Sequence, residues 1–550
     1  MRCVLMAGAA FLAMVGPALA QDAVLSIDNI SQHIRILSDD SFEGRAPGTA
    51  GETKTLEYLT AQYAALGLEP GGENGGWLQP VDLLSFLPSS APQIALLSGD
   101  VRTALDGGSI RLATGQGSGQ VDVRDAPLIF VGFGIHAPEL GWDDLAGADL
   151  TGKIVVYLAG EPDDRSDKGL FEGHARTNHG RGGTKNAQYL ARGAVGAISF
   201  PATAPPVVAA PAGAPASPVV APTPPPRPYI RLKSEAPQLQ FSGSMRGPAV
   251  VELFNAQGLD LSALQAQAAA GPMTAAPIGN ARLSIKADYD VTPIRSYNFV
   301  ARLPGRTRPD ETVLFSAHWD HLGVAATPDA NGDSIYNGAW DNASGTGALI
   351  ELARLFAAGP RPERSVVFLS VTAEESGLLG SQWYAEHPIY PLATTAANFN
   401  MDMIPLTTET RDVEIIGFGK STLEDDLIAA LTADGRVAIP DTHPEEGFYY
   451  RSDHVSFAEK GVPALYFDGG SDLIVGGREA GVAEIARLNE LFYHELDDEW
   501  RPDLNLGAAR QNLTLTYELA RDLANSRRWP EWKEGVDFGV IRAQTADQRR

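Results

Sequence analysis

The pattern of apolar and polar positions becomes regular at about residue 298. From there on, short apolar runs rich in β-branched and aromatic residues alternate with stretches whose apolar residues recur at helical spacing. The expected strands cover residues 313–315, 366–371, 413–416 and 464–467, and the expected helices cover 348–356, 378–385, 427–431 and 508–523. This alternation is typical of an α/β fold, in which helices flank a mixed, twisted β-sheet.

The preceding part of the chain has a less regular pattern. Residues 26–68 have helical apolar spacing with a break around Gly44 and Gly48, and buried strands are expected at 126–135 and 153–158. Residues 201–228 are rich in Pro and Ala, which excludes a regular helix or a central strand, and we expect a semi-rigid extended loop there.

The simplest organisation is one α/β domain interrupted by an insertion. The insertion is expected at residues 121–278, with 21–120 as the N-terminal part of the α/β domain and 279–526 as its main part. The polar residues 527–550 are expected to form a frayed C-terminal tail.

The first twenty residues have the pattern of a signal peptide. Arg2 is followed by an apolar run over residues 3–15 and by Ala18-Leu19-Ala20, after which we expect cleavage. The run is short for a membrane span, although an uncleaved anchor is the alternative. The mature protein is therefore expected in the periplasm or outside the cell, with no membrane segment.

Composition excludes several kinds of function. The formal charge of −25 disfavours a nucleic-acid partner, because such a surface repels phosphate. The single cysteine, Cys3, excludes disulfides, zinc ribbons and a cysteine nucleophile in the mature chain. Any metal site must therefore be built from His, Asp and Glu.

Acidic residues and histidines follow several expected strands directly. His318 and Asp320 come after one strand, and the pair Glu374-Glu375 comes after another. Ligand sites in open α/β sheets form at the carboxyl ends of the strands. His318 suits zinc, with Asp320 as a candidate to fix its tautomer. Because successive residues of an extended chain point in opposite directions, one Glu can bind a metal while the other faces the substrate.

Three further segments add ligand types. Asp341 lies in a glycine-rich turn before a helix, Asp402 ends a short strand, and His494 precedes an acidic run. Taken singly, each of these segments has an ordinary structural explanation, such as a helix cap or a surface loop.

Together, the segments supply two histidines and three carboxylates as candidate ligands: His318, Asp341, Glu375, Asp402 and His494. If Asp341 bridges, each of two metals has one histidine, one further carboxylate and the shared aspartate. Such nitrogen and oxygen ligands with an open position suit catalytic zinc. Two zinc ions can hold a water between them, and Glu374 can accept its proton and return it to a leaving amine.

In this order, the segments resemble the zinc-dependent exopeptidases of the aminopeptidase Y, bacterial aminopeptidase S and glutamate carboxypeptidase II family. The resemblance covers most of residues 26–68 and 298–526. It implies a zinc exopeptidase fold of the phosphorylase/hydrolase-like type and two zinc ions as cofactors. The implied roles are one zinc on His318 and Asp402, a second on Glu375 and His494, Asp341 bridging, Glu374 as general base and Asp320 supporting His318.

The resemblance also suggests residues around the metals. Asp453 and His454 are expected to lie behind the ligands, and Tyr493 or Tyr450 to hydrogen-bond the oxyanion, with Tyr493 favoured because it adjoins His494. The insertion resembles a β-rich protease-associated domain through residues 127–135 and 149–156. The chain departs from many relatives at Glu495-Leu496 and at Pro405, which bears on substrate preference.

The resulting hypothesis is a secreted or periplasmic di-zinc aminopeptidase that releases N-terminal residues from peptides. A carboxypeptidase or dipeptidase on the same scaffold is the first alternative, with Arg451 as a candidate to hold a substrate carboxylate. Two further alternatives are a glutaminyl cyclase with one zinc and a non-catalytic, receptor-like binding protein. The complete ligand set argues against both.

Overall fold

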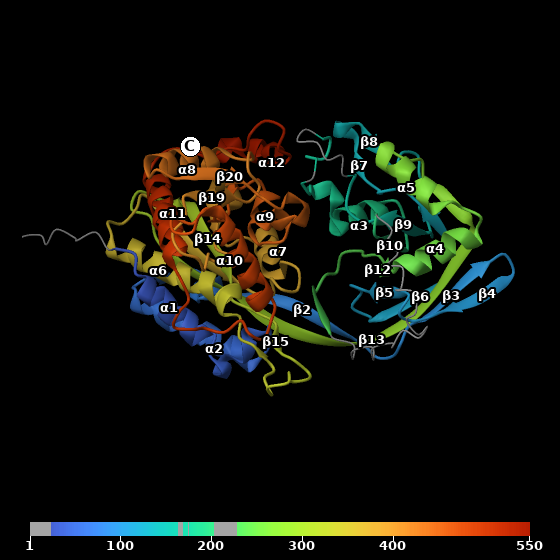
Figure 1. Cartoon of the computed structure of the whole chain (residues 1–550), viewed down its shortest axis with the longest axis horizontal. Coiled ribbons are helices and arrows are strands. Elements are labelled where there is room, and N and C mark those ends of the chain that lie inside the picture. Colours follow the sequence, from blue (N-terminus) through green and yellow to red (C-terminus); the bar gives the residue numbers. More distant parts are fainter. Residues whose placement is uncertain (1–23, 163–168, 174, 203–227, 550) are drawn as a thin grey trace, which may run out of the picture.

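A computed structural model describes residues 24–162, 169–173, 175–202 and 228–549. The expected signal peptide and nearly all of the expected Pro/Ala-rich loop lie outside the described residues. Within the described part, no helix has the length and apolar character needed to cross a membrane. The chain forms two lobes, joined by long strands that run from one to the other (Figure 1).

The first lobe is built on a sheet whose strands run in the order β21, β18, β14, β17, β13. Neighbours from β21 to β17 are parallel, and β13 is antiparallel to β17. The bounds are β13 (Ala276–Leu303), β14 (Arg308–His318), β17 (Arg364–Val371), β18 (Thr395–Asn400) and β21 (Ala464–Leu465). The strands expected at 313–315 and 366–371 are confirmed as parts of β14 and β17.

Both faces of this sheet are covered, which explains the continuous apolar runs. Val313 and Phe315 of β14 pack in a core with residues of α1, α2, α6, α8 and α11, whereas Leu314 packs on the other face with α7 and α9. These helices are α1 (Ile27–Leu37), α2 (Ala50–Ala65), α6 (Gly345–Ala358), α7 (Leu379–Glu386), α8 (Thr422–Ala433), α9 (His454–Ala458) and α11 (Gly507–Asn525). The predicted α/β fold, a mixed sheet flanked by helices, is confirmed.

A smaller sheet and one more long helix also belong to this lobe. The sheet has the order β20 (Val437–Pro440), β19 (Asp412–Ile415), β22 (Phe467–Gly469), and the helix is α10 (Gly477–Phe492). The expected strand at 464–467 is thus divided between β21 and β22.

The second lobe has its own sheet and its own apolar core. Its strands are β3 (Gln93–Ser98), β4 (Val101–Leu105), β5 (Ile110–Ala113), β6 (Gln120–Phe130), β9 (Ile154–Leu158), β10 (Gly196–Phe200) and β12 (Phe241–Met245). Its helices are α3 (Gly182–Ala191), α4 (Gly247–Ala256) and α5 (Leu261–Ala270).

The lobes are not separated where the sequence suggested. The second lobe begins before residue 121, because β3, β4 and β5 belong to its sheet and Leu84 to its core. Residue 278 lies inside β13, a strand of 28 residues that pairs with β6 in one lobe and with β17 in the other. A continuous strand leaves no linker, so the hydropathy pattern does not mark the true boundary between the lobes. The strand β2 (Leu78–Pro88) runs antiparallel beside β13 through the same region.

The expectation of a frayed C-terminal tail is wrong for the described residues up to 549. The segment contains α12 (Phe538–Gln544), and Trp532 and Phe538 are buried. Arg542 is 1% exposed and donates hydrogen bonds to the carbonyls of Thr395, Ala396 and Pro530. A buried arginine that satisfies backbone carbonyls looks polar in the sequence, and for that reason the segment resembled a tail.

Candidate metal centre

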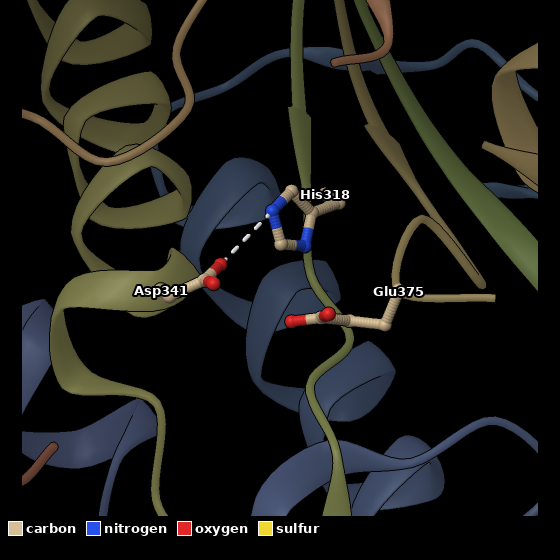
Figure 2. A group of neighbouring side chains, drawn as sticks. All are labelled: His318, Asp341 and Glu375. Carbon is tan, nitrogen blue, oxygen red and sulfur yellow. Dashed lines mark ion pairs between the residues drawn. The ribbon is translucent and has the colours of Figure 1, made fainter. Parts of the chain in front are cut away.

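The candidate site lies at the carboxyl ends of three neighbouring parallel strands. His318 is the last residue of β14, Glu374 and Glu375 follow β17, and Asp402 follows β18. Asp341 lies in the turn that precedes α6, and its peptide bond to Asn342 is cis. Figure 2 shows His318, Asp341 and Glu375 converging from these separate elements.

The two carboxylate oxygens of Asp341 face different partners. Asp341 Oδ1 lies 3.3 Å from Nε2 of His318, whose Nε2 is 3.1 Å from Oδ1 of Asp402. Asp341 Oδ2 lies 3.2 Å from Nε2 of His494, whose Nε2 is 3.2 Å from Oε2 of Glu375. The structure thus brings together the five side chains that the sequence singled out as metal ligands, as two groups of three sharing one aspartate.

These spacings fit a metal. A tetrahedral zinc with bonds of about 2.0–2.2 Å holds neighbouring ligand atoms about 3.3 Å apart. Each group offers one imidazole nitrogen and two carboxylate oxygens, a combination that suits zinc and leaves a position open. The residues present therefore fit a pair of zinc ions.

Electrostatics favour cations at the same place. Burial lowers the pKa of His318, but the carboxylates of Glu374 and Asp402 outweigh it and raise that pKa well above its ordinary value. Burial likewise lowers the pKa of His494, but its hydrogen bonds with the Asp341 and Glu375 carboxylates outweigh burial and raise that pKa to about 10. Burying a charged carboxylate costs free energy unless the group is paired or binds a metal. This cluster of buried carboxylates therefore strongly stabilises positive charge next to it.

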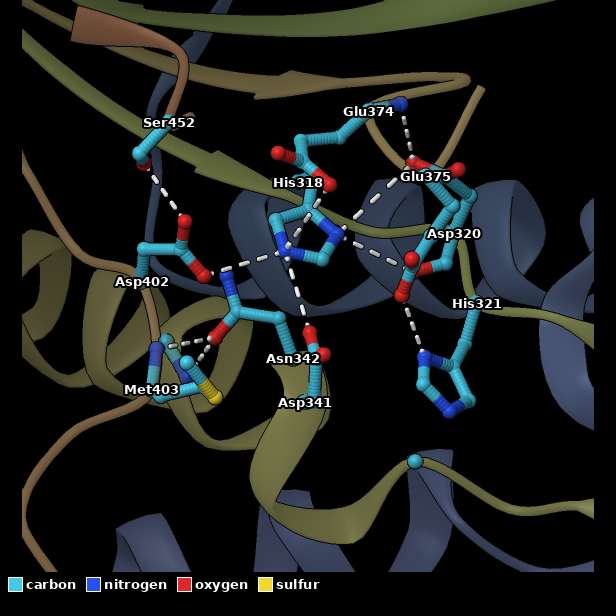
Figure 3. Close-up of polar contacts among 12 residues, drawn as sticks. His318, Asp320, His321, Asp341, Asn342, Glu374, Glu375, Asp402, Met403 and Ser452 are labelled. Carbon is cyan, nitrogen blue, oxygen red and sulfur yellow. Dashed lines mark hydrogen bonds and ion pairs between the residues drawn. The ribbon is translucent and has the colours of Figure 1, made fainter. Parts of the chain in front are cut away.

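Glu374 lies beside the cluster rather than in it. Its Oε2 is 3.9 Å from His318 Nε2, longer than the contacts of the five residues above, and its side chain lines the cavity in front of them. Burial raises the pKa of Glu374 well above its usual range. Figure 3 shows Glu374 and Glu375 approaching His318 from one turn.

Asp320 supports this arrangement in a different way from the one expected. Its backbone carbonyl lies 3.1 Å from Nδ1 of His318, whereas its carboxylate is 3.8 Å from that nitrogen. The carboxylate accepts a hydrogen bond of 3.1 Å from the backbone N–H of Glu374. Asp320 therefore connects the segment that follows His318 with the Glu374-Glu375 turn (Figure 3).

Three further residues contact the carboxylate ligand candidates or the turn that carries one of them, and sequence reasoning assigned these three no individual role. His321 Nδ1 lies 2.6 Å from Glu375 Oε1, and the Ser452 hydroxyl donates to Asp402 Oδ2. The Asp498 carboxylate accepts from the N–H groups of Trp340, at 2.8 Å, and of Asp341, at 3.1 Å. The signal for His321 was its place three residues after His318, and that for Asp498 was the acidic run after His494.

Arg45 holds in place the two loops that follow His318 and precede Asp341. Its side chain is buried and donates to the carbonyls of Trp319, Asn337, Gly338 and Leu37 at 2.6–2.9 Å. It thereby links the N-terminal helices to the segments that carry His318 and Asp341. Nothing in the sequence around Arg45 indicated this contact.

A cavity of about 310 Å³ opens in front of the cluster. Its wall includes Phe448, Tyr450, Tyr466 and Tyr493. The hydroxyl of Tyr493 accepts a 2.9 Å hydrogen bond from Arg451, and that of Tyr466 donates to the Asp402 carbonyl at 3.3 Å. Both tyrosines expected for the oxyanion thus face the cavity, and Tyr466 joins them.

Asp453 and His454 lie behind the cavity wall, at the start of α9, and are fully buried. Burial raises the pKa of Asp453 to about 7. Among the described residues, neither ring nitrogen of His454 has a hydrogen-bond partner. The two residues lie outside both groups of ligand candidates.

Comparison with known proteins agrees with the site. Residues 298–520 match the model of peptidase family M28. A probable zinc metalloprotease of Pyricularia oryzae is 35% identical over 119 residues, which are 22% of this chain and 23% of that protein. Aminopeptidase YwaD of Bacillus subtilis is 29% identical over 189 residues, 34% of this chain and 38% of that protein. The chain therefore spans about a quarter of the length of the first of these relatives and under two fifths of the second.

Among solved structures, an aminopeptidase from Aneurinibacillus sp. strain AM-1 aligns over 93% of this chain and 96% of its own, with 19% identity and a TM-score of 0.49. All five candidate ligands, Glu374 and the cavity tyrosines lie inside the segment that matches the family model. Residues 298–520 of this chain are accordingly a domain of peptidase family M28.

Proposed function

We propose that the protein is a di-zinc aminopeptidase that hydrolyses the N-terminal peptide bond of peptides. The observation that carries this proposal is the placement of the Asp341 carboxylate between two histidines: its Oδ1 faces His318 and its Oδ2 faces His494. In this proposal His318 and Asp402 would hold one zinc, Glu375 and His494 would hold the other, and both ions would share Asp341. Zinc bound there would act as a Lewis acid on the peptide carbonyl and lower the pKa of the attacking water.

The residues of the chain then perform three tasks. Glu374 faces the cavity without belonging to either group of three, so its carboxylate can take a proton from the attacking water and pass it to the leaving amine. Its backbone is held by Asp320, which keeps the carboxylate in place. The Tyr493 hydroxyl accepts its hydrogen bond from Arg451, so its own proton can point to the oxyanion.

The aminopeptidase assignment is supported by the Bacillus relative, which is named as an aminopeptidase. A carboxypeptidase or dipeptidase is the second candidate, and the observation that favours it is Arg451 in the cavity wall. A glutaminyl cyclase would need one zinc, and the second group formed by Glu375 and His494 argues against it. A non-catalytic binding protein is disfavoured because Glu374 and the ligands are all present.

The proposal extends to the rest of the chain. Residues 1–20 would direct export to the periplasm or the medium, and the insertion would act as a protease-associated domain beside the active site. This second lobe reaches the cavity through Arg181, which lines it.

Blocked peptides provide the test. The mature chain is incubated with zinc and with a leucine tripeptide that is unmodified, N-acetylated or C-amidated. Cleavage of the unmodified and C-amidated peptides, but not of the N-acetylated one, supports the aminopeptidase. Cleavage of only the N-acetylated and unmodified peptides would assign a carboxypeptidase instead. A further peptide that begins with glutamine tests the cyclase, and cyclisation of this peptide without hydrolysis of any substrate would contradict both peptidase assignments.

A further inference from the structure

A second cavity adjoins the one in front of the metal centre. It has a volume of about 360 Å³, and the two cavities share Arg181, Tyr450 and Arg451 in their walls. The second cavity is lined by Tyr157, Gly160, Thr177 and Ser199 of the second lobe and by Glu446 and Gly447 of the first. The two cavities, together called the cleft, adjoin at these three residues, between Glu374 and the junction of the lobes.

The walls of this cleft are fixed by contacts between the lobes. The backbone N–H of Arg176 donates to the Pro444 carbonyl at 3.2 Å, and its Nε donates to the Glu445 carbonyl at 2.6 Å. Arg181 forms an ion pair with Glu459. The lobes are thus held together at the place where the second cavity opens.

Outside the metal centre, the side chains that line the two cavities carry more positive than negative charge. The formal charge of the chain is −25, yet three arginines line the two cavities: Arg176, Arg181 and Arg451. Among the described residues, the only acidic one in the walls outside the metal centre is Glu446, whose Oε2 lies 3.9 Å from Arg451 Nη1. A guanidinium presents a planar fork of donors that matches a carboxylate.

Arg451 also stands at a defined place relative to the metal centre. Its Nη2 lies 2.9 Å from the Tyr493 hydroxyl, and the Tyr493 ring stacks on the His494 ring with centroids 4.1 Å apart. One tyrosine therefore separates the guanidinium from a candidate ligand. Because an extended residue spans about 3.3–3.6 Å, a carboxylate one or two residues beyond the cleaved bond comes within reach of this arginine.

We propose that Arg451 and Arg181 bind a carboxylate on the leaving side of the substrate. This proposal rests on the proposed peptidase function. The carboxylate is either the C-terminus of a dipeptide or tripeptide or the side chain of an acidic residue next to the cleaved bond. In the first case the substrates are short peptides, and in the second they are acidic ones.

The first test compares kcat/KM for three pairs of substrates. Leu-Ala-Ala is compared with its C-terminal amide, Leu-Asp-amide with Leu-Asn-amide, and Leu-Ala with leucine p-nitroanilide, which has no carboxylate. We expect the carboxylate to raise kcat/KM roughly tenfold to a hundredfold, the range of a hydrogen-bonded charge. A preference in the first pair identifies the C-terminus, and a preference in the second identifies the side chain. Equal rates within the first two pairs would overturn the proposal.

Variants assign the effect to the arginines. Arg451→Ala, Arg181→Ala and the double variant should lose the preference, measured in each variant as the ratio of kcat/KM within a substrate pair. Arg181→Ala should also keep hydrolysis of leucine p-nitroanilide, and Arg451→Lys should keep part of the preference. Arg451 is accessible, with 45% of its side chain exposed, so its replacement should leave the fold intact, which a thermal melt checks. The control is Arg487→Ala on α10, whose side chain is 56% exposed and pairs with Glu484 outside both cavities. A preference that survives in the double variant would contradict the assignment.

Binding separates this proposal from the proposed function. Calorimetric titration with Ala-Ala and with its amide needs no turnover. If no substrate is hydrolysed but Ala-Ala binds more tightly than its amide, and only when the arginines are present, the peptidase proposal fails while the carboxylate site stands. Equal binding of both compounds would overturn the site.

Discussion

Asp498 offers a sharp test of how the candidate metal centre is held together. Its carboxylate is 1% exposed and accepts hydrogen bonds from the backbone N–H groups of Trp340, at 2.8 Å, and Asp341, at 3.1 Å. In Asp498→Asn one acceptor oxygen becomes an NH₂ group that faces an N–H donor. One hydrogen bond to a charged group, about 1.5–3 kcal/mol, is therefore lost. Because this bond fixes the turn carrying Asp341, we expect a loss of roughly tenfold to a hundredfold in zinc affinity.

The measurement is a competition titration with a chelator of known zinc affinity, combined with kcat for leucine p-nitroanilide. The matched control is Asp497→Asn, one residue earlier, where the side chain is 71% exposed and its contact with Arg501 is 3.6 Å. This control should bind zinc like the unaltered protein. Equal zinc affinity in the two variants would refute the role assigned to Asp498.

Three further changes have expected results. Glu374→Gln should keep both zinc ions and lose roughly a hundredfold to ten-thousandfold in kcat, because it removes only the proton carrier; a variant near full activity would exclude Glu374 as the base. Burial raises the pKa of Glu52 to about 7, so this group stabilises the fold fully below pH 4.5 and loses that contribution as pH rises through 7. Glu52→Gln, which can still bond Gly48 and Ser296, should flatten the dependence of unfolding free energy on pH between 5 and 8, and an unchanged slope in urea titrations would contradict this. Arg542→Ala should lower the unfolding free energy by about 2 kcal/mol or more, because three carbonyls lose a charged donor; an unchanged melting temperature would show that the C-terminal segment contributes nothing.

Much of the first lobe could be predicted because its signals are local. Strands β14 and β17 are buried on both faces, so each appears in the sequence as an unbroken apolar run. The candidate ligands follow the ends of such runs, and parallel strands bring those ends to one edge. The convergence of His318, Glu375 and Asp402 was therefore foreseeable.

The contacts that were missed depend on distant backbone. Arg45 and Arg542 are both buried against carbonyl groups of segments far away in the sequence, and a carbonyl acceptor leaves no mark in the sequence. The limits of the second lobe were missed for a related reason. Strand β13 changes partners along its length without a turn, so no polar linker separates the lobes.

The central claim is that one aspartate, Asp341, is shared by two zinc ions, each of which is also bound by one histidine. Anomalous diffraction from crystals grown with zinc, recorded on both sides of the zinc absorption edge, tests it directly. We expect two peaks about 3.5–4 Å apart, one next to His318 and Asp402 and the other next to His494 and Glu375, with Asp341 between them. A single peak, or peaks away from Asp341, would contradict the account.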